Sequence, residues 1–245
     1  MRVTDTCGCF PTGRHYPGIA HLLLVRSAGL AEEFDPDARW AELPIAFVDV
    51  ETTGTNAAQD RIIEIGIVIG RDGEVQSRHS WLCNPGRPIP KETIDVHGIT
   101  DAEVADKPPF AELLPQIIEA LTGALAGAYN AEFDRAFVLG EAERAGRGGE
   151  NLPPALRPEV RWLDPLPFAR ELFPGKQSRA LGAMCEKLGV ALTRAHRATD
   201  DAEAALRVLY ALGRDPRLPA TYAAFVREQT RLGRAQDEAR RFWRK

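Results

Sequence analysis

The sequence predicts an α/β protein with a mixed β-sheet that is flanked by helices on both faces. Two apolar runs, at residues 45–51 and 61–69, and a third segment at 74–82 follow one another across short polar connections, which is typical of antiparallel strands. Two shorter runs, at residues 126–129 and 160–163, alternate with segments that have the apolar spacing of helices. This order of elements favours a five-stranded sheet that combines hairpins with strands connected through helices.

The first predicted strand carries two acidic residues, Asp49 and Glu51, at its end. Because successive side chains of a strand point to opposite faces, these two carboxylates share one face of the sheet. Neighbouring carboxylates at the end of a buried strand repel each other. We therefore expect a positive charge beside them, and a divalent metal ion is the usual one. The next strand is expected to pair antiparallel with the first, because the connection is short.

Turn and capping signals place the remaining elements. The sequence Arg-Asp-Gly at residues 71–73 predicts a tight turn before the third strand. Thr100 followed by Glu103 has the pattern of a capping box at the start of a short helix. Longer helices are expected at residues 110–125, 130–146, 166–172, 178–188, 201–212 and 216–245.

Bulk composition is that of an ordinary globular chain. The 245 residues are 44% hydrophobic and 27% charged, and a net charge of −4 does not by itself indicate a nucleic-acid-binding protein. The charge is uneven, because residues 217–245 contain eight basic and three acidic residues. Four cysteines are too few for a disulfide framework, and no segment has the pattern of a membrane span or a signal peptide. We therefore expect a cytoplasmic protein without a membrane partner.

The order of these segments divides the chain into three parts. Residues 44–213 contain the predicted sheet and form the main domain. Residues 1–43 are expected to form a leader that is partly disordered and has one helix, at residues 19–33. Residues 214–245 are expected to form a basic helical extension.

Acidic residues mark one edge of the predicted sheet, because each lies where a strand ends or a helix begins. Asp49 and Glu51 end the first strand. Asp134 begins a helix after the fourth strand, and Asp201 begins another helix shortly after His196. Four carboxylates around one cavity can hold two hard divalent ions, which clamp the attacking water and the leaving oxygen of a phosphodiester. The imidazole of His196 suits removal of a proton from that water.

Each of these residues also has a purely structural explanation. Asp134 alone would be a helix cap, and His196 alone would be a surface or capping histidine. Asp200 competes with Asp201 for the ligand position, or serves as the N-cap of the helix. The combination of all the residues, in this order, favours the functional interpretation.

Five segments closely resemble one known family. They read FVDVETTG at 47–54, IIEIGIVIG at 62–70, NPGRPIPKETIDVHGITD at 84–101, YNAEFD at 129–134 and HRATDDAEAA at 196–205. Over residues 44–213 the chain thereby resembles the DEDD-type 3′–5′ exonucleases of the histidine subgroup, which include the proofreading epsilon subunit of bacterial DNA polymerase III and stand-alone relatives. The resemblance implies a ribonuclease H-like fold and two Mg²⁺ or Mn²⁺ ions. It also implies stepwise release of nucleoside 5′-monophosphates from single-stranded or frayed 3′ ends of DNA.

The resemblance implies a role for each matched residue. Asp201, rather than Asp200, fills the third motif, because the motif places the histidine five residues before the aspartate. His196 would be the general base, and Asp49 would bridge both ions. The full set of metal ligands would be Asp49, Glu51, Asp134 and Asp201.

The resemblance also implies contacts with the substrate. Thr52, Thr53 and His97 would lie against the terminal nucleotide. Two positions depart from the family pattern, since Tyr129 stands where relatives often have histidine, and Thr199 stands where leucine is common. Neither departure removes an implied ligand.

Three alternatives stay open. The same fold could act on RNA, because the sequence does not reveal which residues would contact a 2′-hydroxyl. The chain could instead be a non-catalytic nucleic-acid-binding subunit that associates with a polymerase. Residues 214–245 could bind a polymerase or a sliding clamp, although the segment at 229–232 lacks the aromatic residue of a clamp-binding peptide.

Overall fold

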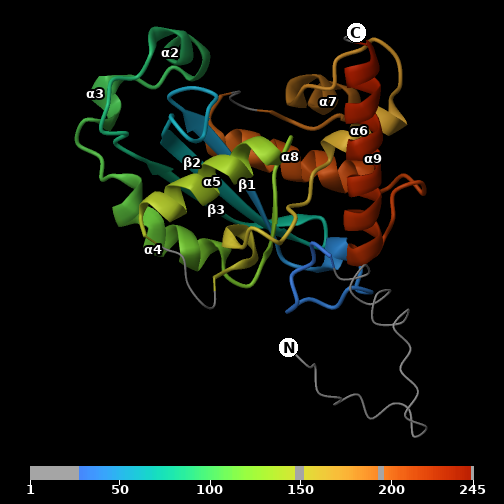
Figure 1. Cartoon of the computed structure of the whole chain (residues 1–245). Coiled ribbons are helices and arrows are strands. Elements are labelled where there is room, and N and C mark those ends of the chain that lie inside the picture. The colour runs from blue at the N-terminus through green and yellow to red at the C-terminus, as the bar shows by residue number, and fades with distance from the viewer. Residues whose placement is uncertain (1–27, 147–151, 193–195, 244–245) are drawn as a thin grey trace, which may run out of the picture.

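The computed structural model describes residues 28–146, 152–192 and 196–243, and it contains a sheet with helices packed on both faces (Figure 1). β1 pairs antiparallel with β2 and parallel with β4, and β2 pairs antiparallel with β3. The predicted mixed sheet and its antiparallel first pair are therefore confirmed. The strands, in the spatial order β3-β2-β1-β4, are β1 (Ile45–Thr52), β2 (Ile62–Arg71), β3 (Glu74–Leu82) and β4 (Leu125–Gly127).

Helices connect the strands and cover the sheet. The capping box predicted at Thr100 forms, because the Glu103 carboxylate accepts a hydrogen bond from the Thr100 N–H at 2.8 Å. None of the helices in the described ranges combines the length and apolar character needed to cross a membrane. The helices in chain order are η1 (Trp40–Glu42), α2 (Lys91–His97), α3 (Asp101–Val104), α4 (Phe110–Leu121), α5 (Glu132–Arg144), η2 (Pro154–Leu156), α6 (Leu166–Leu172), α7 (Leu181–Leu188), α8 (Ala198–Leu212) and α9 (Tyr222–Trp243).

Alternate residues of β1 pack into two different cores. Ile45 and Phe47 lie in the core that includes α8 and α9, whereas Val48 lies in the core that includes α4 and α5. Asp49 and Glu51 continue the row of Ile45 and Phe47, since side chains two apart in a strand share a face. The acidic pair therefore lies on the face of the sheet that α8 covers.

The fifth strand predicted at residues 160–163 is reduced to one bridge, between Leu163 and Gly127. Leu163 makes two backbone hydrogen bonds with the end of β4, of 2.8 and 3.0 Å. The ladder does not extend because the Arg161 N–H donates instead to the carbonyl of Gly29 at 2.9 Å, and because Pro165, the next residue that would face β4, has no N–H. The predicted number of strands is thereby corrected to four for the part of the chain that the structure describes.

The segments on either side of residues 44–213 pack together. Trp40 stacks on Tyr210 of α8, with ring centroids 6.1 Å apart, and it also contacts Phe225 of α9. Residues 28–43 and α9 therefore share one core with α8.

The predicted leader is described only from residue 28. Residues 28–33 form turns, and the earlier part of the helix predicted at 19–33 lies outside the described residues. The N–H of Ala31 donates to the Tyr222 hydroxyl of α9 at 2.9 Å. This contact fixes the described end of the leader against α9.

Candidate active site

β1 extends beyond its partner β4, and this difference in length makes room for Asp134. β4 pairs with β1 only as far as Phe47. The N–H of Val50 donates instead to the Asp134 carboxylate, at 3.1 Å, from the first turn of α5. Asp134 is 3% exposed, so a buried carboxylate is held against the backbone between Asp49 and Glu51.

The start of α8 lies directly on β2 because Gly66 leaves room for it. A Cβ atom at Gly66 would lie 2.3 Å from the backbone nitrogen of Thr199, closer than real Cβ atoms approach. Gly66 is paired with Asp49 across the two strands. α8 therefore begins beside the acidic end of β1, and its first turn contains Asp201.

Glu51, His196 and Asp201 converge at this point. Each offers one ligand atom, and these atoms lie within 4.8 Å of one another. The Asp201 carboxylate accepts a hydrogen bond from the backbone N–H of His196 at 2.7 Å. His196 is exposed and has a φ of 65°, an uncommon value for a residue with a side chain. The carboxylate of Asp201 thus fixes the turn that carries the imidazole.

Mutual repulsion and burial raise the pKa values of the acids. Burial, together with the charges of Asp134 and Asp201, raises the pKa of Asp49 well above its usual value. Burial raises the pKa of Asp134 in the same way, despite its hydrogen bond from β1. Burial and the charges of Asp201 and Glu64 raise the pKa of Glu51 to about 7. Acids held this close favour either protonation or a bound cation.

We refer to Asp49, Glu51, Asp134 and Asp201 together as the carboxylate cluster. Within the described ranges, no Lys or Arg forms an ion pair with any of its four members. Carboxylate oxygens are the ligands that hard divalent ions prefer. The residues present therefore fit a divalent metal site.

Glu64 adjoins the carboxylate cluster and was not predicted from the sequence. It stands opposite Glu51 in the β1–β2 pairing and is 1% exposed. Arg197 forms an ion pair with it at 2.7 Å, and the N–H of Ala198 donates to it at 3.2 Å. Glu64 therefore ties the first residues of α8 to β2. The available signal was an acidic residue inside the otherwise apolar run at 62–70, since buried acids are rare unless paired.

The threonines predicted to contact substrate lie in the turn that follows Glu51. Thr52 and Thr53 are both buried. The Thr52 hydroxyl donates to the carbonyl of Gly54 at 2.6 Å, and the Thr53 hydroxyl donates to the Asp60 carboxylate at 3.3 Å. Both hydroxyls are therefore engaged within the turn, and its backbone is held in one conformation.

His97 lies at the end of α2, within electrostatic reach of Glu64 and His196. Its Nδ1 accepts a hydrogen bond from the N–H of Ile99 at 3.0 Å, and its buried Nε2 has no hydrogen-bond partner among the residues described. Burial lowers the pKa of His97; the charge of Glu64 opposes this effect, and that of His196 adds to it. The pKa of His97 therefore depends on charges from both β2 and the turn that precedes α8.

The side chains at the two departures from the family pattern are hydrogen-bonded to backbone carbonyls. The Tyr129 hydroxyl donates to the backbone carbonyl of Arg179 at 2.6 Å. The Thr199 hydroxyl donates to the backbone carbonyl of His79 at 3.4 Å. Both side chains therefore serve local packing.

Comparison with known proteins identifies the family. The Exonuclease family matches residues 46–209, about two thirds of the chain. The chain belongs to the Exonuclease family. The prediction of a DEDD-type exonuclease, a nuclease that acts by hydrolysis, is thereby confirmed, as is the ribonuclease H-like fold.

The chain is similar to a DNA polymerase and to two exonucleases of known structure. A PolC-type DNA polymerase III from Bacillus cereus is 35% identical over 164 residues, which cover 67% of this chain and 11% of that protein. The structure of exonuclease X in complex with 5′ overhanging duplex DNA is 27% identical, with a TM-score of 0.55, and the match covers 75% of this chain and 98% of that one. E. coli exonuclease I in complex with a dA16 oligonucleotide has a TM-score of 0.61 at 21% identity, covering 71% and 42% of the two chains, which shows the shared fold. The chain thus spans about a tenth of the length of the Bacillus cereus polymerase.

Proposed function

We propose that this Exonuclease-family chain removes nucleotides from single-stranded or frayed 3′ ends of DNA and releases nucleoside 5′-monophosphates, in a hydrolysis that depends on divalent metal ions. The observation that carries the proposal is the carboxylate cluster, which β1, α5 and α8 bring together beside the exposed imidazole of His196. Among the described residues these four acids form no ion pair with a Lys or Arg, so a bound cation would relieve their repulsion. Divalent cations at the same place would promote cleavage of a phosphodiester.

The carboxylate cluster is assigned to two ions, Mg²⁺ or Mn²⁺, because all four ligands supply oxygen. When bound, such ions stabilise the charge that develops on a phosphodiester and increase the acidity of water. Asp49 would hold the ions together with the other three members. The supporting observation is that the charges of all three raise its pKa.

His196 is assigned to take the proton from the attacking water. Its imidazole is exposed and therefore accessible to solvent and substrate. The carboxylates of Glu51 and Asp201 beside it stabilise the positive charge that the ring acquires with the proton. The bond from its backbone N–H to Asp201 keeps the ring in place while the proton moves.

Thr52, Thr53 and His97 are assigned to the terminal nucleotide. The turn of the two threonines follows Glu51 directly, so its backbone lies next to the reacting bond. The buried Nε2 of His97 is a polar atom that an incoming nucleotide would satisfy. DNA is favoured over RNA because exonuclease X, at 27% identity, is described in complex with DNA. Parallel digestion of matched DNA and RNA oligomers distinguishes the two substrates.

We also propose a DNA polymerase III as partner, in the cytoplasm, with residues 44–213 as the exonuclease domain. Similarity to a PolC-type polymerase supports this partner. A sliding-clamp contact through residues 229–232 is disfavoured, because the Gln229 side chain is 9% exposed and bonds to the backbone of both Trp162 and Asp164. A pull-down that offers purified polymerase and clamp separately tests this preference.

The direct test is digestion of a single-stranded oligonucleotide labelled at its 5′ end, with Mg²⁺ or Mn²⁺. The parental protein should produce a ladder that shortens from the 3′ end, together with nucleoside 5′-monophosphates. Asp134→Asn should lose this activity, whereas Asp200→Asn, which changes an acid of α8 outside the carboxylate cluster, should keep it. Release of the 5′ label as a mononucleotide, without a ladder, would refute the direction. Binding without digestion would favour the non-catalytic subunit instead.

A further inference from the structure

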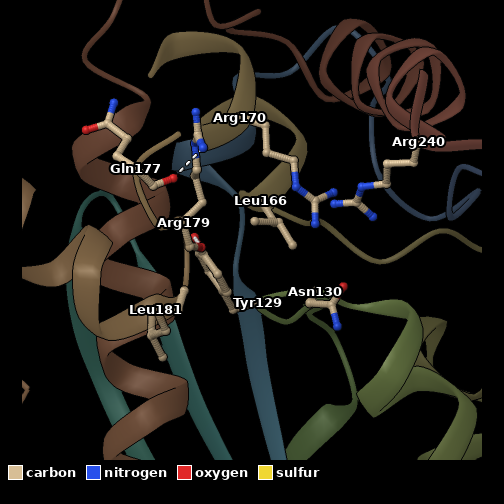
Figure 2. A pocket seen from close by; sticks show the side chains of 9 residues that line it. Tyr129, Asn130, Leu166, Arg170, Gln177, Arg179, Leu181 and Arg240 are labelled. Atoms are coloured by element: carbon tan, nitrogen blue, oxygen red, sulfur yellow. Dashed lines mark hydrogen bonds between the residues drawn. The ribbon is translucent and has the colours of Figure 1, made fainter. Parts of the chain in front are cut away.

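A hollow of about 640 Å³ lies between the end of β4, the α6–α7 connection and α9 (Figure 2). Three arginines from different segments line it, Arg170 of α6, Arg179 just before α7, and Arg240 of α9. Tyr129 and Leu181 contribute apolar walls. No member of the carboxylate cluster lines this hollow.

The three guanidinium groups have few anionic partners. Arg170 and Arg179 form no ion pair with the residues that the structure describes; Arg170 donates to the side chain of Gln236 at 3.3 Å, and Arg179 donates to backbone carbonyls. Arg240 lies 3.8 Å from Asp237, and both side chains are more than half exposed. In Figure 2 the guanidinium groups of Arg170 and Arg240 point toward each other. Like charges that face each other repel, and an anion between them would relieve the repulsion.

One buried acid, Asp164, lies beside the hollow but does not neutralise it. Its carboxylate accepts hydrogen bonds from three backbone N–H groups, at 2.8 to 3.1 Å. Burial raises the pKa of Asp164 to about 6. Asp164 attracts Arg170, yet burial and the charge of Arg240 still lower the pKa of Arg170. The hollow therefore keeps an excess of positive charge.

The hollow adjoins the carboxylate cluster. Asn130, which lines it, lies in the turn that leads into α5, where its carbonyl accepts the N–H of Phe133 at 3.1 Å, and Asp134 lies in the first turn of that helix. The charge of Asp164 also contributes to the raised pKa of Asp134. A DNA strand whose terminal phosphodiester lies at the carboxylate cluster therefore comes within reach of the hollow.

We propose that this hollow binds a backbone phosphate of the substrate strand, away from the bond that is cleaved, through Arg170, Arg179 and Arg240. The proposal rests on the exonuclease activity proposed above. The planar fork of a guanidinium group matches the oxygens of a phosphate. Arg240 belongs to α9, beyond the residues 46–209 that the Exonuclease family matches, so this contact comes from the extension of this chain.

The test compares two substrates in three variants. The substrates are a single-stranded DNA oligonucleotide and the p-nitrophenyl ester of thymidine 5′-monophosphate, which has one phosphate and can occupy only the carboxylate cluster. The variants are Arg170→Gln, Arg240→Gln and, as matched control, Arg241→Gln, which removes an exposed charge from the same helix outside the hollow. The ratio of kcat/KM for the oligonucleotide to kcat/KM for the ester should fall by about tenfold in Arg170→Gln and about threefold in Arg240→Gln. It should stay at the parental value in Arg241→Gln.

Salt dependence gives a second readout. Loss of one phosphate contact on a single strand should reduce the slope of log affinity against log salt by about 0.7. If Arg170→Gln and Arg240→Gln retain the parental ratio and the parental slope, the phosphate site is refuted while the exonuclease activity stands; this result would fit an acidic protein partner. If Arg170→Gln is unstable, Arg240→Gln at the exposed helix end decides alone. A parental protein that cleaves neither substrate refutes the proposed function and the phosphate site together.

Discussion

Replacing Glu51 by Gln should stabilise the protein at alkaline pH when no divalent ion is present. Burial and the charges of Asp201 and Glu64 raise the pKa of Glu51 from 4.5 to about 7 in the folded protein. The folded state therefore binds this proton more tightly than the unfolded chain does. Consequently, folding stability falls as the pH rises from about 4.5 to about 7, and the loss is complete above that range. A Gln side chain has nearly the same shape and no charge, so it removes this loss.

The magnitude follows from the two pKa values. The difference between 4.5 and about 7 corresponds to about 3 kcal/mol of folding free energy at alkaline pH. Because Glu51 is only half-buried, solvent screens part of this effect, and we expect a gain of about 2 kcal/mol. For a chain of this size, that gain raises the Tm by about 4 to 8 °C. At pH 5 the gain should be about a quarter as large, since Glu51 is then mostly protonated in the folded state.

Thermal unfolding followed by circular dichroism in EDTA, at about pH 5 and about pH 8.5, measures the effect. Glu119→Gln, on the exposed side of α4, is the matched control and should show no pH-dependent gain. Addition of Mg²⁺ or Mn²⁺ at alkaline pH should stabilise the parental protein more than Glu51→Gln, because the variant lacks one ligand. A Tm for Glu51→Gln at or below the parental value at pH 8.5 would refute the reasoning, since the carboxylates would then impose no strain that a cation relieves.

The remaining predictions concern three other residues of the site, Asp134, His196 and Glu64. Asp134→Asn should lower kcat/KM on an oligonucleotide by at least about 10²-fold while leaving the Tm unchanged or raised, because a ligand and a source of repulsion disappear together; a variant with parental activity would remove Asp134 from the site. His196→Ala should lower kcat by about 10² to 10⁴-fold and leave the circular dichroism spectrum intact, since the side chain is exposed; a smaller loss would assign the proton transfer elsewhere. Glu64→Gln should cost about 1 to 2 kcal/mol in urea unfolding and reduce kcat, because the ion pair with Arg197 no longer holds the start of α8. Ser80→Ala, which removes only a 3.3 Å hydrogen bond to Glu64, is its control, and an equal loss in both variants would contradict the positioning role.

Elements with strong local signals were predictable, and elements that depend on distant partners were not. β3 and α6 have the predicted bounds, because a turn with Gly73 precedes one and prolines flank the other. The fifth strand failed although its residues are apolar and buried. A strand exists only where its backbone finds a partner, and here the Arg161 N–H, which would face β4, donates instead to the carbonyl of the distant residue Gly29. No local pattern in residues 160–163 indicates the contact with Gly29, whereas Pro165 does mark the point beyond which the strand cannot extend.

The residues of the site also divide into those with a local signal in the sequence and those without one. The alternation of a strand was enough to place Asp49 and Glu51 on one face. Asp134 and Asp201 needed the family pattern, because an acid at a helix start resembles a cap, and both do accept backbone hydrogen bonds in the structure. Glu64 was not predicted, because its partner Arg197 is 133 residues away in the sequence and only the fold brings the two together.

The arrangement of charges around Glu64 is the strongest structural support for the proposal that the carboxylate cluster binds metal. Arg197 lies close enough to lower the pKa of Glu51, yet its guanidinium group forms its ion pair with Glu64. Glu64 also accepts the N–H of Ala198, so its oxygens are already engaged and it is unsuited to be a further ligand. In a purely structural network of charges, each acid would form an ion pair with a base. Here Arg197 forms its ion pair with Glu64, the acid that ties α8 to β2. The carboxylate cluster keeps only backbone N–H donors, at Asp134 and Asp201, within the described part of the chain. Its remaining negative charge can be balanced only by protons or by cations from solution, and above the raised pKa values cations are what remains.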